Sequence, residues 1–230
     1  MEAINTFHRQ EVKYVLSHKQ YSSILDIIKQ HVPPDVFSNY LVQSLYFDTD
    51  NWDIVRHSIS KPIFKEKLRL RCYGIPGASS TIYLELKKKY KGIVHKRRIE
   101  FPMEFLNNKT AREIVTKDTS QTGRELEFYL RTNQVYEKAH ISYIRTAFSD
   151  DGGLRITFDT NLLFRTTMLD YAHPGDGLPI IPNDFVIMEV KTLGGIPIWL
   201  ANFLSKLYIF PKSFSKIGTG YKKYIIGKDV

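Results

Sequence analysis

The 230-residue chain is 43% hydrophobic and 25% charged, which provides enough apolar material for a packed core and argues against intrinsic disorder. Its single cysteine, Cys72, excludes a disulfide framework and a cysteine-based metal site, and agrees with a reducing, cytoplasmic setting. The net charge of +9 predicts a polyanionic partner, either nucleic acid, anionic lipid or a phosphorylated small molecule. We expect one domain over residues 1–230, without a signal peptide or a membrane span.

Period-two alternation of polar and apolar residues recurs along the chain and predicts strands. We expect eight strands, over residues 7–16, 41–48, 64–73, 81–89, 93–101, 141–148, 154–161 and 185–191. Segments rich in Gly, Pro and Asp separate several of them, and residues 170–183 predict a long loop. Helices are expected over residues 19–31, 52–58, 103–117, 124–136 and 198–208. Ser17 is placed to cap the first of these helices.

Long cationic side chains dominate one face of strand after strand. The cations that share such a face are Lys67, Arg69, Arg71, Lys87, Lys96, Arg98, Arg145 and Arg155. An ordinary antiparallel sheet turns a mixed polar face to water, and that is the simpler interpretation of each strand taken alone. However, like charges opposite one another across a sheet are destabilising, so this many cations on one face indicate a bound anion.

We therefore expect an α+β, mainly β fold: an eight-stranded antiparallel barrel closed into a tunnel, with its charged face inward and helices packed outside. Low-dielectric walls would strengthen each contact with phosphate oxygens. Carboxylates interleave with the cations at Glu11, Glu85, Asp159 and Glu189. Such oxygen donors suit Mg²⁺ or Mn²⁺, although each carboxylate can instead form a salt bridge with a neighbouring Lys or Arg.

Six short motifs follow one another along these predicted strands: Arg9-Gln-Glu-Val-Lys-Tyr14, Ser44-Leu-Tyr-Phe-Asp-Thr49, Lys67-Leu-Arg-Leu-Arg71, Glu85-Leu-Lys87, Tyr143-Ile-Arg145 and Met188-Glu-Val-Lys191. In this order they resemble the VTC domain, named after the vacuolar transporter chaperone. That domain belongs to the triphosphate tunnel metalloenzymes, which are related to CYTH proteins. The resemblance covers roughly residues 7–223. It implies a tunnel barrel that makes polyphosphate from the terminal phosphate of a nucleoside triphosphate, with a divalent metal, Mn²⁺ or Mg²⁺.

The resemblance also implies roles for individual residues. The phosphate ligands in the catalytic set would be Lys13, Arg69, Arg71, Lys87, Lys96, Arg145 and Arg155. Glu189 would bind the metal, with Glu11 assisting directly or through water. Further substrate-binding residues expected from these motifs and faces are Arg9, Lys67, Arg98, Tyr143, Lys191 and Lys216. Lys216 resembles a lysine that closes the tunnel, but a surface lysine in a terminal loop is the common alternative.

Two reactions remain open at this point, because phosphoryl transfer asks mainly for positioning and charge stabilisation. If the phosphoryl group is transferred to a phosphate chain, the site is a polyphosphate polymerase; if it is transferred to water, the site is a triphosphatase. A non-catalytic module that binds polyphosphate or a nucleotide is a third possibility. The expected partners are ATP or another triphosphate and inorganic polyphosphate. Nucleic acid is not expected, because most aromatic residues fall with the aliphatic ones rather than among the cations.

Two further segments have weaker signals. Residues 218–222 contain two glycines and a lysine but lack the spacing of a P-loop, so they predict a turn. Asp48 follows an aromatic pair and is either a site residue or the start of the turn into the next helix.

Overall fold

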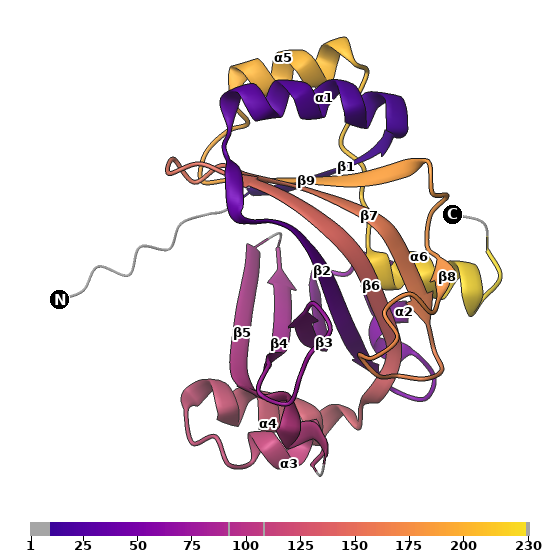
Figure 1. The fold of residues 1–230 in the computed structure, drawn as a ribbon. Helices are drawn as coiled ribbons and strands as arrows, with labels where there is room; N and C mark the ends of the chain where they lie inside the picture. The colour runs from indigo at the N-terminus through magenta and orange to yellow at the C-terminus, as the bar shows by residue number, and fades with distance from the viewer. Residues whose placement is uncertain (1–9, 92, 108, 229–230) are drawn as a thin grey trace. The chain divides into compact units, whose positions relative to one another are not determined.

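The computed structural model describes residues 10–91, 93–107 and 109–228 (Figure 1). The elements in chain order are β1 (Gln10–Ser17), α1 (His18–His31), β2 (Pro34–Asp48), α2 (Asp53–Ile59), β3 (Phe64–Tyr73), β4 (Thr81–Tyr90), β5 (Ile93–Pro102), the 3-10 helix η1 (Met103–Asn107), α3 (Ala111–Val115), α4 (Gln121–Asn133), β6 (Tyr136–Ser149), β7 (Arg155–Arg165), β8 (Leu178–Pro179), β9 (Phe185–Thr192), α5 (Ile198–Lys206) and α6 (Lys216–Tyr224). Each of the eight predicted strands corresponds to an observed one. The two-residue strand β8 was not predicted and lies in the expected long loop.

The strands hydrogen-bond in the order β1-β9-β7-β6-β2-β3-β4-β5, and β8 pairs with β7. The pairs β1–β9, β9–β7, β2–β3, β3–β4 and β4–β5 are all antiparallel. A mainly β, antiparallel α+β fold is therefore confirmed. The order is open among the described residues, with β1 at one end and β5 at the other, so the expected closure into a barrel is not confirmed.

The chain divides into two compact units. Unit 1 comprises the described residues of 1–40, 143–162 and 181–215, and unit 2 those of 41–142, 163–180 and 216–230. The strands β2, β6 and β7 each run from one unit into the other along the chain. The single domain expected over residues 1–230 stays a prediction. No helix in the described part of the chain is both long and apolar enough to cross a bilayer.

In unit 1, helices α1 and α5 lie side by side over β1 and β9 (Figure 1). Their buried residues, such as Ile28 and Leu200, pack with Tyr14, Phe158 and Met188 of the strands. Ser17 caps α1 as predicted, because its hydroxyl accepts a hydrogen bond from the backbone N–H of residue 20 in a capping box. The apolar face of these strands is thus covered, which leaves the charged residues of β1 and β9 on the other face.

In unit 2, the apolar face of the β3–β4–β5 meander packs against α3 and α4. The core contains Leu68 and Leu70 of β3, Leu84 and Leu86 of β4, and Leu126 of α4. Successive strand residues point to opposite faces, so the residues between these leucines point away from the helices. The period-two pattern therefore predicted the buried face of this meander correctly.

Two predicted helices differ from the structure because of local caps. The helix expected over residues 103–117 is split into η1 and α3, since Thr110 forms a new capping box with Glu113. Helix α4 begins three residues earlier than expected, because the Ser120 hydroxyl accepts a hydrogen bond from Gly123 N and caps it. For Asp48 the structure agrees with the second of the two expected roles, at the turn into the next helix: its carboxylate accepts hydrogen bonds from Ile54 N (2.8 Å) and Val55 N (2.9 Å) at the start of α2.

The C-terminal turn was predicted wrongly. Residues 216–224 form helix α6, so Lys216 begins a helix and does not lie in a loop. Two glycines make this segment a poor helix former on propensity alone. Packing decides otherwise, because a Cβ at Gly220 would lie 2.4 Å from Cδ2 of Phe164 on β7. Glycine is therefore required there for the close approach of α6 to β7.

Candidate functional site

The charged face of unit 2 is ordered in cross-strand rows. The pairing places Tyr46, Arg69, Glu85 and Arg98 opposite one another on β2, β3, β4 and β5. The next row consists of Lys67, Lys87 and Lys96. Directly opposed residues of an antiparallel pair project on the same side. The structure thus brings together the site residues predicted on β3, β4 and β5 except Arg98, whose side chain is exposed. We name the following residues the basic cluster: Tyr46, Lys67, Arg69, Arg71, Glu85, Lys87 and Lys96.

Glu85 lies at the centre of the basic cluster and is 1% exposed. Arg69 donates to Glu85 Oε2 from Nε at 2.9 Å and from Nη2 at 2.8 Å, and Lys96 Nζ forms an ion pair with Oε1. Burial raises the pKa of Glu85, but the charges of Arg69 and Arg71 and the contact with Lys96 outweigh it and lower the pKa to about 2. Glu85 is therefore an ionised counter-ion within the cluster. Of the two roles expected for the interleaved carboxylates, metal ligand or salt-bridge partner, this geometry favours the salt bridge for Glu85.

Tyr46 belongs to the basic cluster and was not singled out from the sequence. Arg69 Nη1 donates to Tyr46 Oη at 3.0 Å, and the guanidinium carbon lies 5.8 Å from the centre of the Tyr46 ring. Burial raises the pKa of the phenol, while Arg69, Arg71 and Lys67 lower it further, to about 7. The sequence offered one indication of this role: Tyr46 lies two residues from both Ser44 and Asp48 in one of the six motifs, so the three side chains share a strand face.

The charged face of unit 1 forms a second group on β1, β9 and β7. Its rows are Glu11–Lys191–Arg155 and Lys13–Glu189–Thr157. Lys13 Nζ lies 3.3 Å from Glu11 Oε1 and 3.9 Å from Glu189 Oε2, and Lys191 Nζ lies 2.7 Å from Glu189 Oε1. Four predicted residues therefore form a continuous chain of opposite charges. We name Glu11, Lys13, Glu189 and Lys191 the carboxylate–lysine cluster.

Arg145 and Asp159 form a buried ion pair in unit 1. Arg145 Nε and Nη2 donate to the two carboxylate oxygens at 2.6 and 2.8 Å. Burial lowers the pKa of Arg145, but Tyr143, Asp159 and Glu189 raise it well above its ordinary value. The predicted phosphate ligand Arg145 is thus held in a bidentate pair, with its guanidinium carbon 5.3 Å from the centre of the Tyr143 ring.

Two other predicted residues, Arg155 and Arg98, lie outside these groups. Arg155 donates to Asp35 Oδ2 at 3.1 Å and to Tyr40 Oη at 3.3 Å, both in the first half of β2. Arg98 is exposed, with its guanidinium carbon 4.5 Å from the centre of the Tyr83 ring. The prediction for Arg9 lies outside the described residues.

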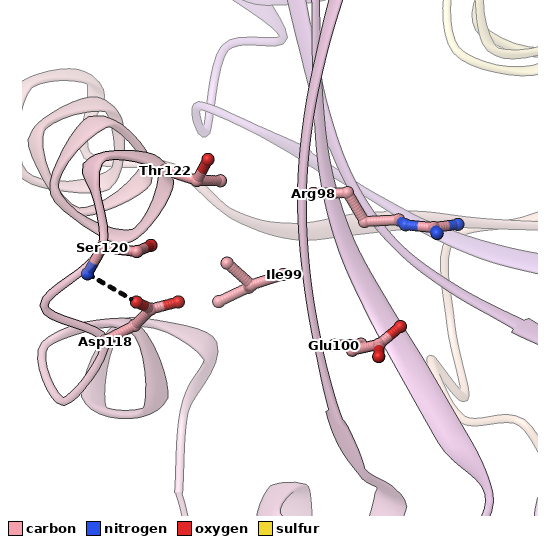
Figure 2. A pocket seen from close by; sticks show the side chains of 6 residues that line it. All are labelled: Arg98, Ile99, Glu100, Asp118, Ser120 and Thr122. Atoms are coloured by element: carbon pink, nitrogen blue, oxygen red, sulfur yellow. Dashed lines mark hydrogen bonds between the residues drawn. The ribbon is translucent and has the colours of Figure 1, made fainter. Parts of the chain in front are cut away.

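A cavity of about 450 Å³ in unit 2 lies beside β5 and the beginning of α4. Figure 2 shows Ile99 directed toward Asp118, Ser120 and Thr122, whereas Arg98 and Glu100 point to the other side of β5. Ser120 N donates to Asp118 Oδ1 at 2.8 Å. Only one lining residue, Arg98, belongs to the predicted site, so the basic cluster and this cavity are different features.

The side chains that could bind a divalent metal ion lie in unit 1. No group of three or more His, Cys, Asp or Glu residues within the described ranges could hold a metal by itself. Glu11 and Glu189 supply two carboxylates, and the buried Thr157 Oγ1 has no hydrogen-bond partner in the part of the chain that the structure describes. Mg²⁺ and similar ions usually take one or two carboxylates and complete their shell with waters and substrate phosphates. This donor set fits such an ion.

Several solved structures match this chain over most of its length at low identity. The PH1819 protein from Pyrococcus horikoshii OT3 is 14% identical, with 93% of this chain and 99% of that chain covered and a TM-score of 0.49. A chain of the Schizosaccharomyces pombe Mediator head module is 11% identical (94% and 95% covered, TM-score 0.47). The RNA triphosphatase domain of a trifunctional mimivirus mRNA capping enzyme is also 11% identical (89% and 88% covered, TM-score 0.40). All three TM-scores are below 0.5, so no residue role is transferred from them.

The family assignment rests on sequence. No curated protein sequence gives a significant match. The family model described as the VTC domain matches residues 8–225, a range that includes every described strand and helix. This range also contains the basic cluster and the carboxylate–lysine cluster. The chain therefore belongs to the VTC domain family.

Proposed function

We propose that this chain is a metal-dependent phosphotransferase, a polyphosphate polymerase that uses the terminal phosphate of ATP or another nucleoside triphosphate. The observation that carries this proposal is the charge of the basic cluster. Its members include five cations and one carboxylate, Glu85, and both rows lie on one face of the β3–β4–β5 meander. Such crowding of like charges is unfavourable unless an anion neutralises it, and a triphosphate supplies several charges in a row.

The basic cluster would bind and orient the phosphates. Arg69 and Arg71 offer guanidinium donors that can contact phosphate oxygens in pairs, while Lys67, Lys87 and Lys96 act as point charges. The transition state of phosphoryl transfer spreads negative charge over the equatorial oxygens of the transferred group. Fixed cations at those oxygens stabilise it, and most of the catalysis is then positioning and electrostatics.

The carboxylate–lysine cluster would hold the divalent metal, Mn²⁺ or Mg²⁺, through Glu189 with help from Glu11. When bound, such an ion neutralises charge on phosphate oxygens. Lys13 and Lys191 now neutralise these carboxylates, and their ammonium groups can contact phosphate instead when a metal takes the carboxylate oxygens. The acceptor in polymer synthesis is the terminal phosphate of a growing chain, which needs no strong general base.

One assay tests the function and its competitor together. The purified chain is incubated with ATP and Mn²⁺, and chain polyphosphate and free phosphate are both measured over time. Polymer that lengthens with time supports the polymerase. Free phosphate without polymer identifies a triphosphatase, and no turnover despite tight ATP binding identifies a binding module. Glu189→Ala should abolish metal-dependent turnover and keep part of the nucleotide binding, whereas Asp184→Ala, at an exposed position, should behave as wild type.

A further inference from the structure

Thr157 has an unusual environment for a hydroxyl group. The residue is 2% exposed on β7, and Oγ1 has no hydrogen-bond partner among the residues that the structure describes. Most buried side-chain polar atoms have at least one partner, so each exception needs an explanation. Leaving a buried hydroxyl unpaired costs stability, whereas valine would fill the same space in a strand without that cost.

The position of Thr157 in the sheet indicates where its partner would lie. Thr157 is the direct antiparallel neighbour of Glu189 on β9, and Glu189 is in turn the neighbour of Lys13 on β1. Side chains of directly opposed residues project on the same face, so the Thr157 hydroxyl and the Glu189 carboxylate share the charged face of unit 1. Glu189 is buried as well, and Lys13 and Lys191 already contact its two oxygens.

A hard divalent cation is the ligand that would use this hydroxyl. Such ions take oxygen donors and combine carboxylates with neutral oxygens and water. A hydroxyl adds an oxygen without adding negative charge, which suits a site that must also accept phosphate. An apolar ligand would leave Oγ1 unpaired, and a phosphate beside Glu189 would meet like charge.

We propose that Thr157 Oγ1 is a further oxygen ligand of a divalent metal held by Glu189, bound to the ion directly or through one of its waters. The inference rests on the metal part of the proposed function and adds a ligand that the motifs do not contain. It also explains why a threonine occupies a buried position where its hydroxyl has no partner among the described residues.

Three variants of the full chain test it with Mn²⁺ alone, without nucleotide. Thr157→Val removes the hydroxyl at constant shape, Thr157→Ser keeps it, and Thr160→Val is the matched control on the opposite face of β7. Binding is measured from the electron paramagnetic resonance signal of free Mn²⁺, and thermal unfolding is followed with and without the ion. We expect Thr157→Val to weaken Mn²⁺ binding about tenfold or more, because removing even a group that contacts a metal only indirectly costs about 10–100-fold in affinity. Thr157→Ser and Thr160→Val should bind as wild type.

The unfolding temperature without metal distinguishes a metal ligand from a residue that only supports the fold, because loss of a ligand weakens metal binding without lowering this temperature. Thr157→Val should unfold at the same temperature as wild type or higher without metal, because an unpaired buried hydroxyl is gone, and should gain less stability from Mn²⁺. Wild-type affinity in Thr157→Val, or a clear loss of metal-free stability, would overturn the proposal. If Glu189→Gln weakens binding but Thr157→Val does not, the metal site stands and only the role of Thr157 fails. If wild type binds no Mn²⁺, both fail.

Discussion

Removal of the Asp159 carboxylate tests how strongly the charged face of unit 1 depends on buried ion pairing. Asp159 is fully buried and the Arg145 side chain is 9% exposed, so water screens their attraction little. Asp159→Ala leaves a buried guanidinium without its bidentate partner. Breaking a buried pair in this way costs about 3–5 kcal/mol. At roughly 2–4 °C per kcal/mol for a chain of this size, the unfolding temperature should fall by about 6–20 °C.

The assay is thermal and urea unfolding followed by circular dichroism, with Asp184→Ala as an exposed control in the same unit. The double variant Arg145→Met/Asp159→Ala should recover part of the loss, because no buried charge is left unpaired. A loss below about 1 kcal/mol in Asp159→Ala, the range of exposed pairs, would show that the pair is hydrated and that the reasoning from burial is wrong. A strictly additive double variant would also contradict it.

Three more predictions concern unit 2. The pKa of Glu85 is lowered to about 2, so its ion pairs stabilise the fold fully above about pH 4.5 and are lost as the pH falls through about 2. In unfolding measurements over a pH series, Glu85→Gln should therefore reduce the loss of stability at acid pH. The pKa of Tyr46 is about 7, so its phenolate should weaken tripolyphosphate binding increasingly above pH 7, and Tyr46→Phe should remove this extra pH dependence in calorimetric titrations. Gly220→Ala should destabilise the chain by about 1–3 kcal/mol through overpacking on Phe164, while Gly175→Ala, which has open space around it, should have no such effect.

The sequence was most informative where structure depends on near neighbours. Alternation in a strand is a relation between residues i and i+2, so the faces of β3, β4 and β5 could be assigned from the order of residues alone. That pattern correctly placed Lys67, Arg69 and Arg71 on one face and Leu68 and Leu70 in the core. The capping hydroxyl of Ser17 was found for the same reason, since its partner is three residues away.

Pairing between distant segments was decided only by the tertiary structure. The sequence showed Glu85 and Asp159 as carboxylates among cations, but not that Arg69 and Lys96 hold the first and Arg145 the second. These partners are chosen by strand register and burial.

Helix α6 shows the same limit, because the need for glycine at position 220 arises from Phe164 on another element. The alternation of side chains in a strand is a local property of the backbone, so the sequence by itself determined which residues share a face. Which charges neutralise one another depends on contacts across long stretches of chain, and only the folded sheet brings those groups within reach.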